Sequence, residues 1–165
     1  MKFWLLLLVI VGQIIVLAGE YLNAIYPLWL GQEIKLKTIP VDPRSLFRGN
    51  YARLNYDISD VYSKNLPDNI RNGEIVYVSL KMNEKGIYEF NTISLTPPRS
   101  DMFIRGRIKQ YYYSKDTYSV KYGIEAYFAP KEKALALEND LRSGGIAVVM
   151  VANNGKATLK SVIAN

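Results

Sequence analysis

The chain opens with a long apolar run and continues as short segments in which apolar and polar residues alternate. Residues 3–19 carry no charge and only one strong polar side chain, Gln13. Helix continuation to Ile25 would bring the run to the length that a ~30 Å hydrocarbon core requires. We therefore expect a transmembrane signal anchor over residues 1–30 and one domain over residues 31–165.

Two interpretations of the first segment remain open. It is either an uncleaved anchor or a signal peptide that is cleaved after residues 16–18 (VLA). We favour the anchor because the apolar run exceeds the ~7–15 residues of a signal-peptide core. Pro27 disfavours helical geometry at Tyr26, so we expect the helix to stop there, with Tyr21 and Trp29 as interfacial aromatics.

Alternating patterns predict strands with one buried face in the rest of the chain. The turn-forming residues 83–86 (NEKG) and 153–155 (NNG) predict hairpins. The predicted strands cover residues 34–38, 52–58, 74–82, 87–95, 102–109, 118–128, 146–151 and 156–163, and one short helix covers residues 131–141. About eight strands this close in sequence predict a mainly β domain, an antiparallel sandwich or barrel.

Composition restricts the chemistry that the chain can perform. There is no cysteine and no histidine, which excludes disulfides, thiolate nucleophiles, imidazole catalysis and the common zinc sites. Carboxylates, lysine, tyrosine or serine would have to carry any reaction. No metal-ligand spacing or glycine-rich phosphate loop is present, so we expect no metal and no cofactor. The net charge of +6 fits anionic surfaces, but many folded domains share such a surplus.

Residues 40–56 (PVDPRSLFRGNYARLNY) hold the densest group of special residues. In one interpretation Asp42 and the arginines tie a loop together through ion pairs. In a second, Arg44, Arg48 and Arg53 form a surface that recognises anions, because guanidinium groups bind carboxylate and phosphate well. The third is a Ser–Lys hydrolase with Ser45 as nucleophile and Lys81 as base.

A second basic group lies on the predicted strand 102–109. Arg105, Arg107 and Lys109 project from one face at two-residue spacing. Such a row is most often a solvated face that also protects a sheet edge. The alternative is a site for lipid headgroups or an acidic polymer.

Residues 49–56 (GNYARLNY) resemble the central motif of the GDYXXLXY family of bacterial membrane-anchored proteins. The match comprises Gly49, Tyr51, Leu54 and Tyr56 at the family spacing, and residues 41–48, 122–130 and the hairpin around residues 154–155 strengthen it. Asn50 replaces the motif's aspartate, which counts against carboxylate chemistry but is compatible with a turn-forming role. The resemblance implies a membrane-associated module that works with a multi-spanning partner, and it implies no substrate, cofactor or reaction.

We expect a single-pass protein of the bacterial inner membrane with an extracytoplasmic domain. Its expected role is non-enzymatic binding through the Arg-rich loop at 42–53; the alternatives are the Ser–Lys hydrolase and a small-ligand barrel. Expected partners are the lipid bilayer, a multi-spanning membrane protein or an anionic envelope component, and no nucleic acid. The candidate binding residues are Asp42, Arg44, Arg48, Asn50, Tyr51 and Arg53.

Overall fold

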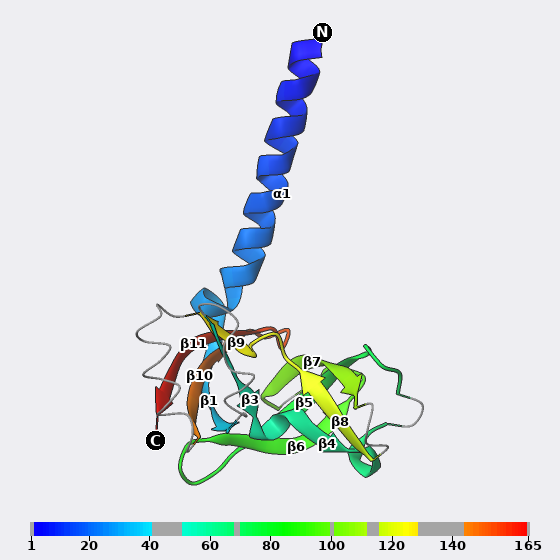
Figure 1. The fold of residues 1–165 in the computed structure, drawn as a ribbon, viewed down its shortest axis with the longest axis vertical. Helices are drawn as coiled ribbons and strands as arrows, with labels where there is room; N and C mark the ends of the chain where they lie inside the picture. The colour runs from blue at the N-terminus through cyan, green and yellow to red at the C-terminus, as the bar shows by residue number, and fades with distance from the viewer. Residues whose placement is uncertain are drawn as a thin grey trace.

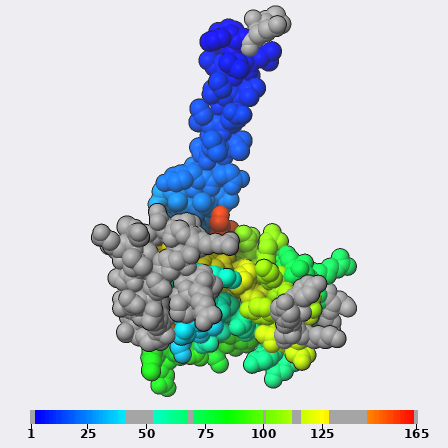
Figure 2. Space-filling view, in the orientation of Figure 1, coloured from blue at the N-terminus to red at the C-terminus, as the bar shows by residue number. Residues whose placement is uncertain are grey.

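A computed structural model describes residues 2–40, 51–67, 70–99, 101–111, 116–128 and 144–164 of the chain. One long helix, α1 (Lys2–Leu30), projects from a β domain (Figure 1). Its segment Phe3–Leu30 is apolar and long enough to cross a membrane. Its side chains stand clear of the domain over most of the helix (Figure 2), so the apolar surface has no cover within the described chain.

The helix does not stop at Tyr26, contrary to our expectation from Pro27. It runs through the buried Pro27 to Leu30. A proline inside a helix leaves the carbonyl four residues earlier without its donor. Here that carbonyl belongs to Asn23, and it accepts a hydrogen bond from the Lys156 amino group at 2.5 Å. A donor from a distant β hairpin thus satisfies the group that Pro27 leaves free.

Eleven strands follow the helix in the described residues. They are β1 (Gln32–Ile39), β2 (Tyr51–Arg53), β3 (Asn55–Tyr56), β4 (Asp60–Tyr62), β5 (Ile75–Met82), β6 (Tyr88–Ser94), β7 (Phe103–Gln110), β8 (Thr117–Lys121), β9 (Ala126–Phe128), β10 (Gly145–Val151) and β11 (Ala157–Ala164). Two short 3-10 turns, η2 (Asp57–Ser59) and η3 (Ser63–Asn65), flank β4. The prediction of a mainly β domain is confirmed.

The main sheet has the order β11-β10-β1-β6-β5-β7-β8-β4, with β3 joined to β1. It curls into a half-barrel (Figure 1). The paired strands are antiparallel except β1 and β6, which meet in parallel at Leu36 and Tyr88. The sheet is therefore mixed, whereas the sequence led us to expect an antiparallel one. A pairing between strands so far apart in the sequence leaves no signal in the local pattern. Strands β2 and β9 form a separate two-stranded sheet.

The alternating patterns place the core correctly. In β7 the apolar Ile104 and Ile108 are buried, whereas Arg107 and Lys109 are exposed. The motif residues Leu54 and Tyr56 are buried as well.

Two of the predicted strands are interrupted. The segment expected at 118–128 breaks between β8 and β9, where Gly123 adopts a φ of +82° that only glycine accepts readily. The segment expected at 52–58 breaks into β2, β3 and η2. The helix predicted at 131–141 lies outside the described residues.

Candidate functional site

The motif segment is held against the later segment 122–128. Strand β2 pairs antiparallel with β9, aligning Arg53 with Ala126. The backbone N–H of Leu54 then donates to the carbonyl of Glu125 at 2.8 Å. Both segments contribute to the resemblance described above, and the fold makes them a single structural unit.

Two tyrosines hold this unit together in a reciprocal manner. The Tyr56 hydroxyl donates to the carbonyl of Ile124 at 2.5 Å, and the Tyr122 hydroxyl donates to the carbonyl of Ile58 at 2.6 Å. Each segment thus provides one hydroxyl donor and one carbonyl acceptor, and all four groups lie in the interior. Burial, reinforced by the negative charge of Glu125, raises the pKa of both hydroxyls well above the ordinary tyrosine value. We call this arrangement the tyrosine clamp.

The Glu125 carboxylate folds back onto its own loop. One oxygen accepts the N–H of Tyr122 at 2.6 Å and the other accepts the N–H of Gly123 at 3.0 Å. These bonds satisfy two backbone donors at the point where the positive φ of Gly123 interrupts the strand. The carboxylate therefore fixes the Tyr122 side of the clamp.

The structure describes part of the predicted binding surface. Arg53 is exposed at the end of β2, and the backbone of Tyr51 pairs with Phe128. The predicted residues Asp42, Arg44, Arg48 and Asn50, and the alternative nucleophile Ser45, lie outside the described residues. Lys81, the proposed base of the hydrolase alternative, is exposed on β5 and lacks the burial that activates a lysine.

The second basic group occupies one face of β7, as the pattern predicts. Arg105 is half-buried, and Arg107 and Lys109 are exposed. A hollow of about 410 Å³ beside them is lined by Ile75, Arg105, Gly106, Arg107, Lys121, Tyr122, Gly123 and Glu125. We call it the Arg107 hollow. It takes in Arg105 and Arg107 but not Lys109, so it divides the predicted row.

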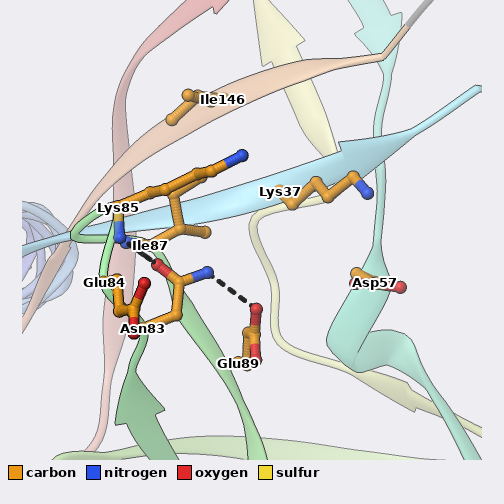
Figure 3. A pocket seen from close by; sticks show the side chains of 8 residues that line it. All are labelled: Lys37, Asp57, Asn83, Glu84, Lys85, Ile87, Glu89 and Ile146. Carbon is orange, nitrogen blue, oxygen red and sulfur yellow. Dashed lines mark hydrogen bonds between the residues drawn. The ribbon is translucent and has the colours of Figure 1, made fainter.

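A larger hollow of about 700 Å³ lies next to the motif, because Asp57 directly follows Tyr56. Figure 3 shows Lys37 of β1 extending towards the side on which Asp57 lies. The turn between β5 and β6 forms the other wall, where Asn83 donates to Glu89 at 2.7 Å and accepts the N–H groups of residues 85 and 87. The hollow is lined by Lys37, Asp57, Asn83, Glu84, Lys85, Ile87, Glu89 and Ile146. We call it the Lys37 hollow.

The model of the GDYXXLXY protein family matches residues 13–162, most of the sequence. The chain belongs to the GDYXXLXY family. The matched range includes the apolar helix from Gln13 onward as well as most of the β domain, so the family match covers part of that helix and the tyrosine clamp together. No curated protein and no solved structure matches the chain.

The structure brings residues into the two hollows that the sequence did not single out. Lys121 joins the basic row because the strand register sets it opposite Arg107. Lys37, Asp57 and Lys85 converge from three separate elements. No local spacing connects these residues, and only the sheet order brings them together. Glu125 had one usable signal, the glycine two residues before it, which is typical of a strand break.

Proposed function

We propose that this member of the GDYXXLXY family is a single-pass protein of the bacterial inner membrane whose extracytoplasmic domain binds an anionic partner without performing catalysis. The surface assigned to binding is the Arg-rich loop at 42–53. A multi-spanning membrane protein or an anionic envelope component is the class of partner that this surface fits.

The observation that carries this proposal is the direct connection between the helix and the domain. Gly31 alone separates α1 from β1, and its N–H donates to the carbonyl of Pro27 at 2.9 Å. A Cβ at Gly31 would come within 2.3 Å of that carbonyl oxygen, so the junction has no room for another residue type. Lys156 and Thr158 bind the helix carbonyls of Asn23 and Ala24. A helix fastened in this way holds the domain at a fixed position beside the membrane.

The tyrosine clamp supports a binding role for the motif segment. The hydroxyls of Tyr56 and Tyr122 are buried and occupied by backbone carbonyls, so they serve to hold the segment and not to react. The Arg-rich loop at 42–53 therefore follows one fixed strand, β1, and ends on another, β2. Its three arginines are the groups in it best suited to bind anions.

Crosslinking in native membranes tests the binding surface. We expect the full-length protein to crosslink to a specific membrane partner, and we expect Arg48→Ala and Arg53→Ala each to lower the yield several-fold. Lys81→Ala is the matched control, since Lys81 is also an exposed cation but lies on β5. Equal yields from all variants would contradict the assignment of residues 42–53.

A reporter fusion tests the sidedness of the domain. Only Lys2 precedes the apolar span, but long domains are translocated largely regardless of their charge. We expect a reporter at the carboxyl terminus to be active outside the cytoplasm. Cytoplasmic activity would overturn the extracytoplasmic placement and leave the anchor itself intact.

The Lys37 hollow supports a second candidate function, small-ligand binding. Its volume of about 700 Å³ lies within the ~300–1,000 Å³ typical of small-molecule sites. The lysines and carboxylates that line it suit a ligand carrying both charges. Native mass spectrometry of the full chain should then detect a retained small molecule that Lys37→Met loses and Lys109→Met keeps. Retention of that molecule by both variants would place it elsewhere.

A further inference from the structure

The outer face of β7 and β8 brings cations directly opposite each other. The register pairs Arg107 with Lys121, and side chains paired in this way lie on one face with Cβ atoms ~4.5–5.5 Å apart. Like charges at such positions destabilise a sheet. Arg105, two residues earlier on β7, adds a third cation to the same face. An anion bound between them would relieve this repulsion.

The Arg107 hollow is open to such an anion. Gly106 is part of its lining and contributes only backbone atoms to it. The one carboxylate among the described lining residues, Glu125, is occupied by two backbone N–H groups. Within the described part of the chain, the side chains of Arg105 and Lys121 have no hydrogen-bond or ion-pair partner. Arg107 donates one N–H to the carbonyl of Gly73 at 3.0 Å, which leaves its other donors available.

Hydrogen bonds connect this hollow to the base of α1. The N–H of Arg105 donates to the carbonyl of Gly155 at 2.7 Å. The next residue, Lys156, extends its amino group to the carbonyl of Asn23 on the helix. The Arg105 end of the hollow therefore lies on the side of the domain from which the helix leaves.

The length of α1 sets the distance from this side to the lipid. Residues 3–22 would cover a hydrocarbon core of about 30 Å, and residues 23–30 would add about 12 Å. The headgroup layer of one leaflet occupies roughly 5–7 Å of that length. Because Lys156 reaches Asn23, the hairpin between β10 and β11 touches the helix at the level of the headgroups.

We propose that the Arg107 hollow binds the phosphate of an anionic lipid headgroup in the same membrane that α1 spans. Arg105, Arg107 and Lys121 supply the charge and the donors. The inference rests on the proposed anchoring of α1. It adds a site separate from the Arg-rich loop at 42–53 and predicts that the domain is held down against the bilayer at a second point.

Nuclear magnetic resonance of the full chain in nanodiscs tests the site directly. The amide signals of residues 105–107 and 121–123 are followed as phosphatidylglycerol replaces phosphatidylcholine. We expect these signals to shift with the phosphatidylglycerol content. We expect Arg107→Gln and Lys121→Gln each to raise the half-saturating content about fivefold, the factor that corresponds to one cation near a charged surface.

Lys109→Gln is the matched control, because Lys109 lies on the same face of β7 but outside the hollow. It should change the half-saturating content less than twofold. An equal effect of all three substitutions would overturn the site in favour of diffuse attraction. Absence of any shift with phosphatidylglycerol would overturn it as well.

Inorganic phosphate added to phosphatidylcholine nanodiscs separates the two sources of the ligand. We expect millimolar phosphate to leave the signals unchanged, and the same shifts with free phosphate would overturn the lipid assignment. Release of the protein from native membranes by alkaline carbonate would show instead that the anchor fails. Failure of the anchor and failure of the site are therefore distinguishable.

Discussion

The tyrosine clamp and the Arg107 hollow both include residues of the short segment 122–125, but they differ in whether their polar groups have partners. In the clamp, Tyr56 and Tyr122 bury their hydroxyls, and each hydroxyl has a carbonyl acceptor. In the hollow, Arg107 and Lys121 lie opposite each other, and the lining that the structure describes offers them no carboxylate that is free to pair. Satisfied polar groups stabilise a fold, whereas unneutralised neighbouring charges indicate a ligand. The clamp hydroxyls therefore serve the structure, whereas the cations of the Arg107 hollow form the surface that we propose for binding.

The largest expected effect comes from removing one half of the clamp. Tyr56→Ala deletes a fully buried ring and should lower the free energy of unfolding by about 3–5 kcal/mol. The measurement is urea denaturation of the full chain in a mild neutral detergent. Tyr62→Ala is the control, because Tyr62 is 60% exposed and should change the free energy by less than about 0.5 kcal/mol. Similar losses for both variants would show that the clamp has no special role.

Overpacking at Gly106 should disturb the core beside the tyrosine clamp. Its Cβ would come within 2.4 Å of Val120 and 3.0 Å of the Tyr122 ring. We expect Gly106→Ala to reduce the free energy of unfolding by about 1–3 kcal/mol, measured in the same denaturation experiment. Lys109→Ala, an exposed change on the same strand, should be nearly neutral. A neutral Gly106→Ala would mean that the clamp shifts to make room.

Removing only the hydroxyls isolates the two clamp bonds. Tyr56→Phe and Tyr122→Phe each leave a buried carbonyl without its donor, and each should cost about 1–2 kcal/mol. A double-mutant cycle should give a coupling energy of at least about 0.5 kcal/mol, because both bonds join the same two segments. Strict additivity would show that the bonds act independently.

Alkaline pH should weaken the clamp without any mutation. The pKa of each clamp hydroxyl is raised in the folded state, so the folded protein keeps protons that the unfolded chain releases above about pH 10. The stabilisation is complete below that pH and falls as the pH rises, by up to about 1.4 kcal/mol per pH unit for each tyrosine. Denaturation at several pH values should show a shallower loss for the double variant Tyr56→Phe/Tyr122→Phe. Identical slopes would contradict the burial of the hydroxyls.

The sequence predicts those features of the two regions that depend on the local pattern of apolar and polar residues. Alternation identifies the strands and their faces, and it correctly places Leu54 and Tyr56 in the core and Arg107 on the surface. Alternation along one strand does not predict which strands pair with each other across the sheet. Nothing near Arg107 predicts that Lys121 lies opposite, and nothing near Pro27 predicts that Lys156 satisfies the carbonyl of Asn23. The hollows and the helix junction are set by such long-range contacts, which a local pattern does not record.

The smallest expected effect concerns Glu125. Its carboxylate holds the loop of the tyrosine clamp and also lines the Arg107 hollow. Glu125→Gln keeps an acceptor for one of the two N–H groups but removes the charge, which should cost about 1 kcal/mol of stability. Among the described residues that line the Arg107 hollow, Glu125 is the only one with a negative charge, so binding of phosphatidylglycerol in nanodiscs should strengthen. Stability and lipid binding would then move in opposite directions in a single variant. If both decline together, the carboxylate acts on the hollow only by holding its loop in place, and the electrostatic contrast between the tyrosine clamp and the Arg107 hollow is refuted.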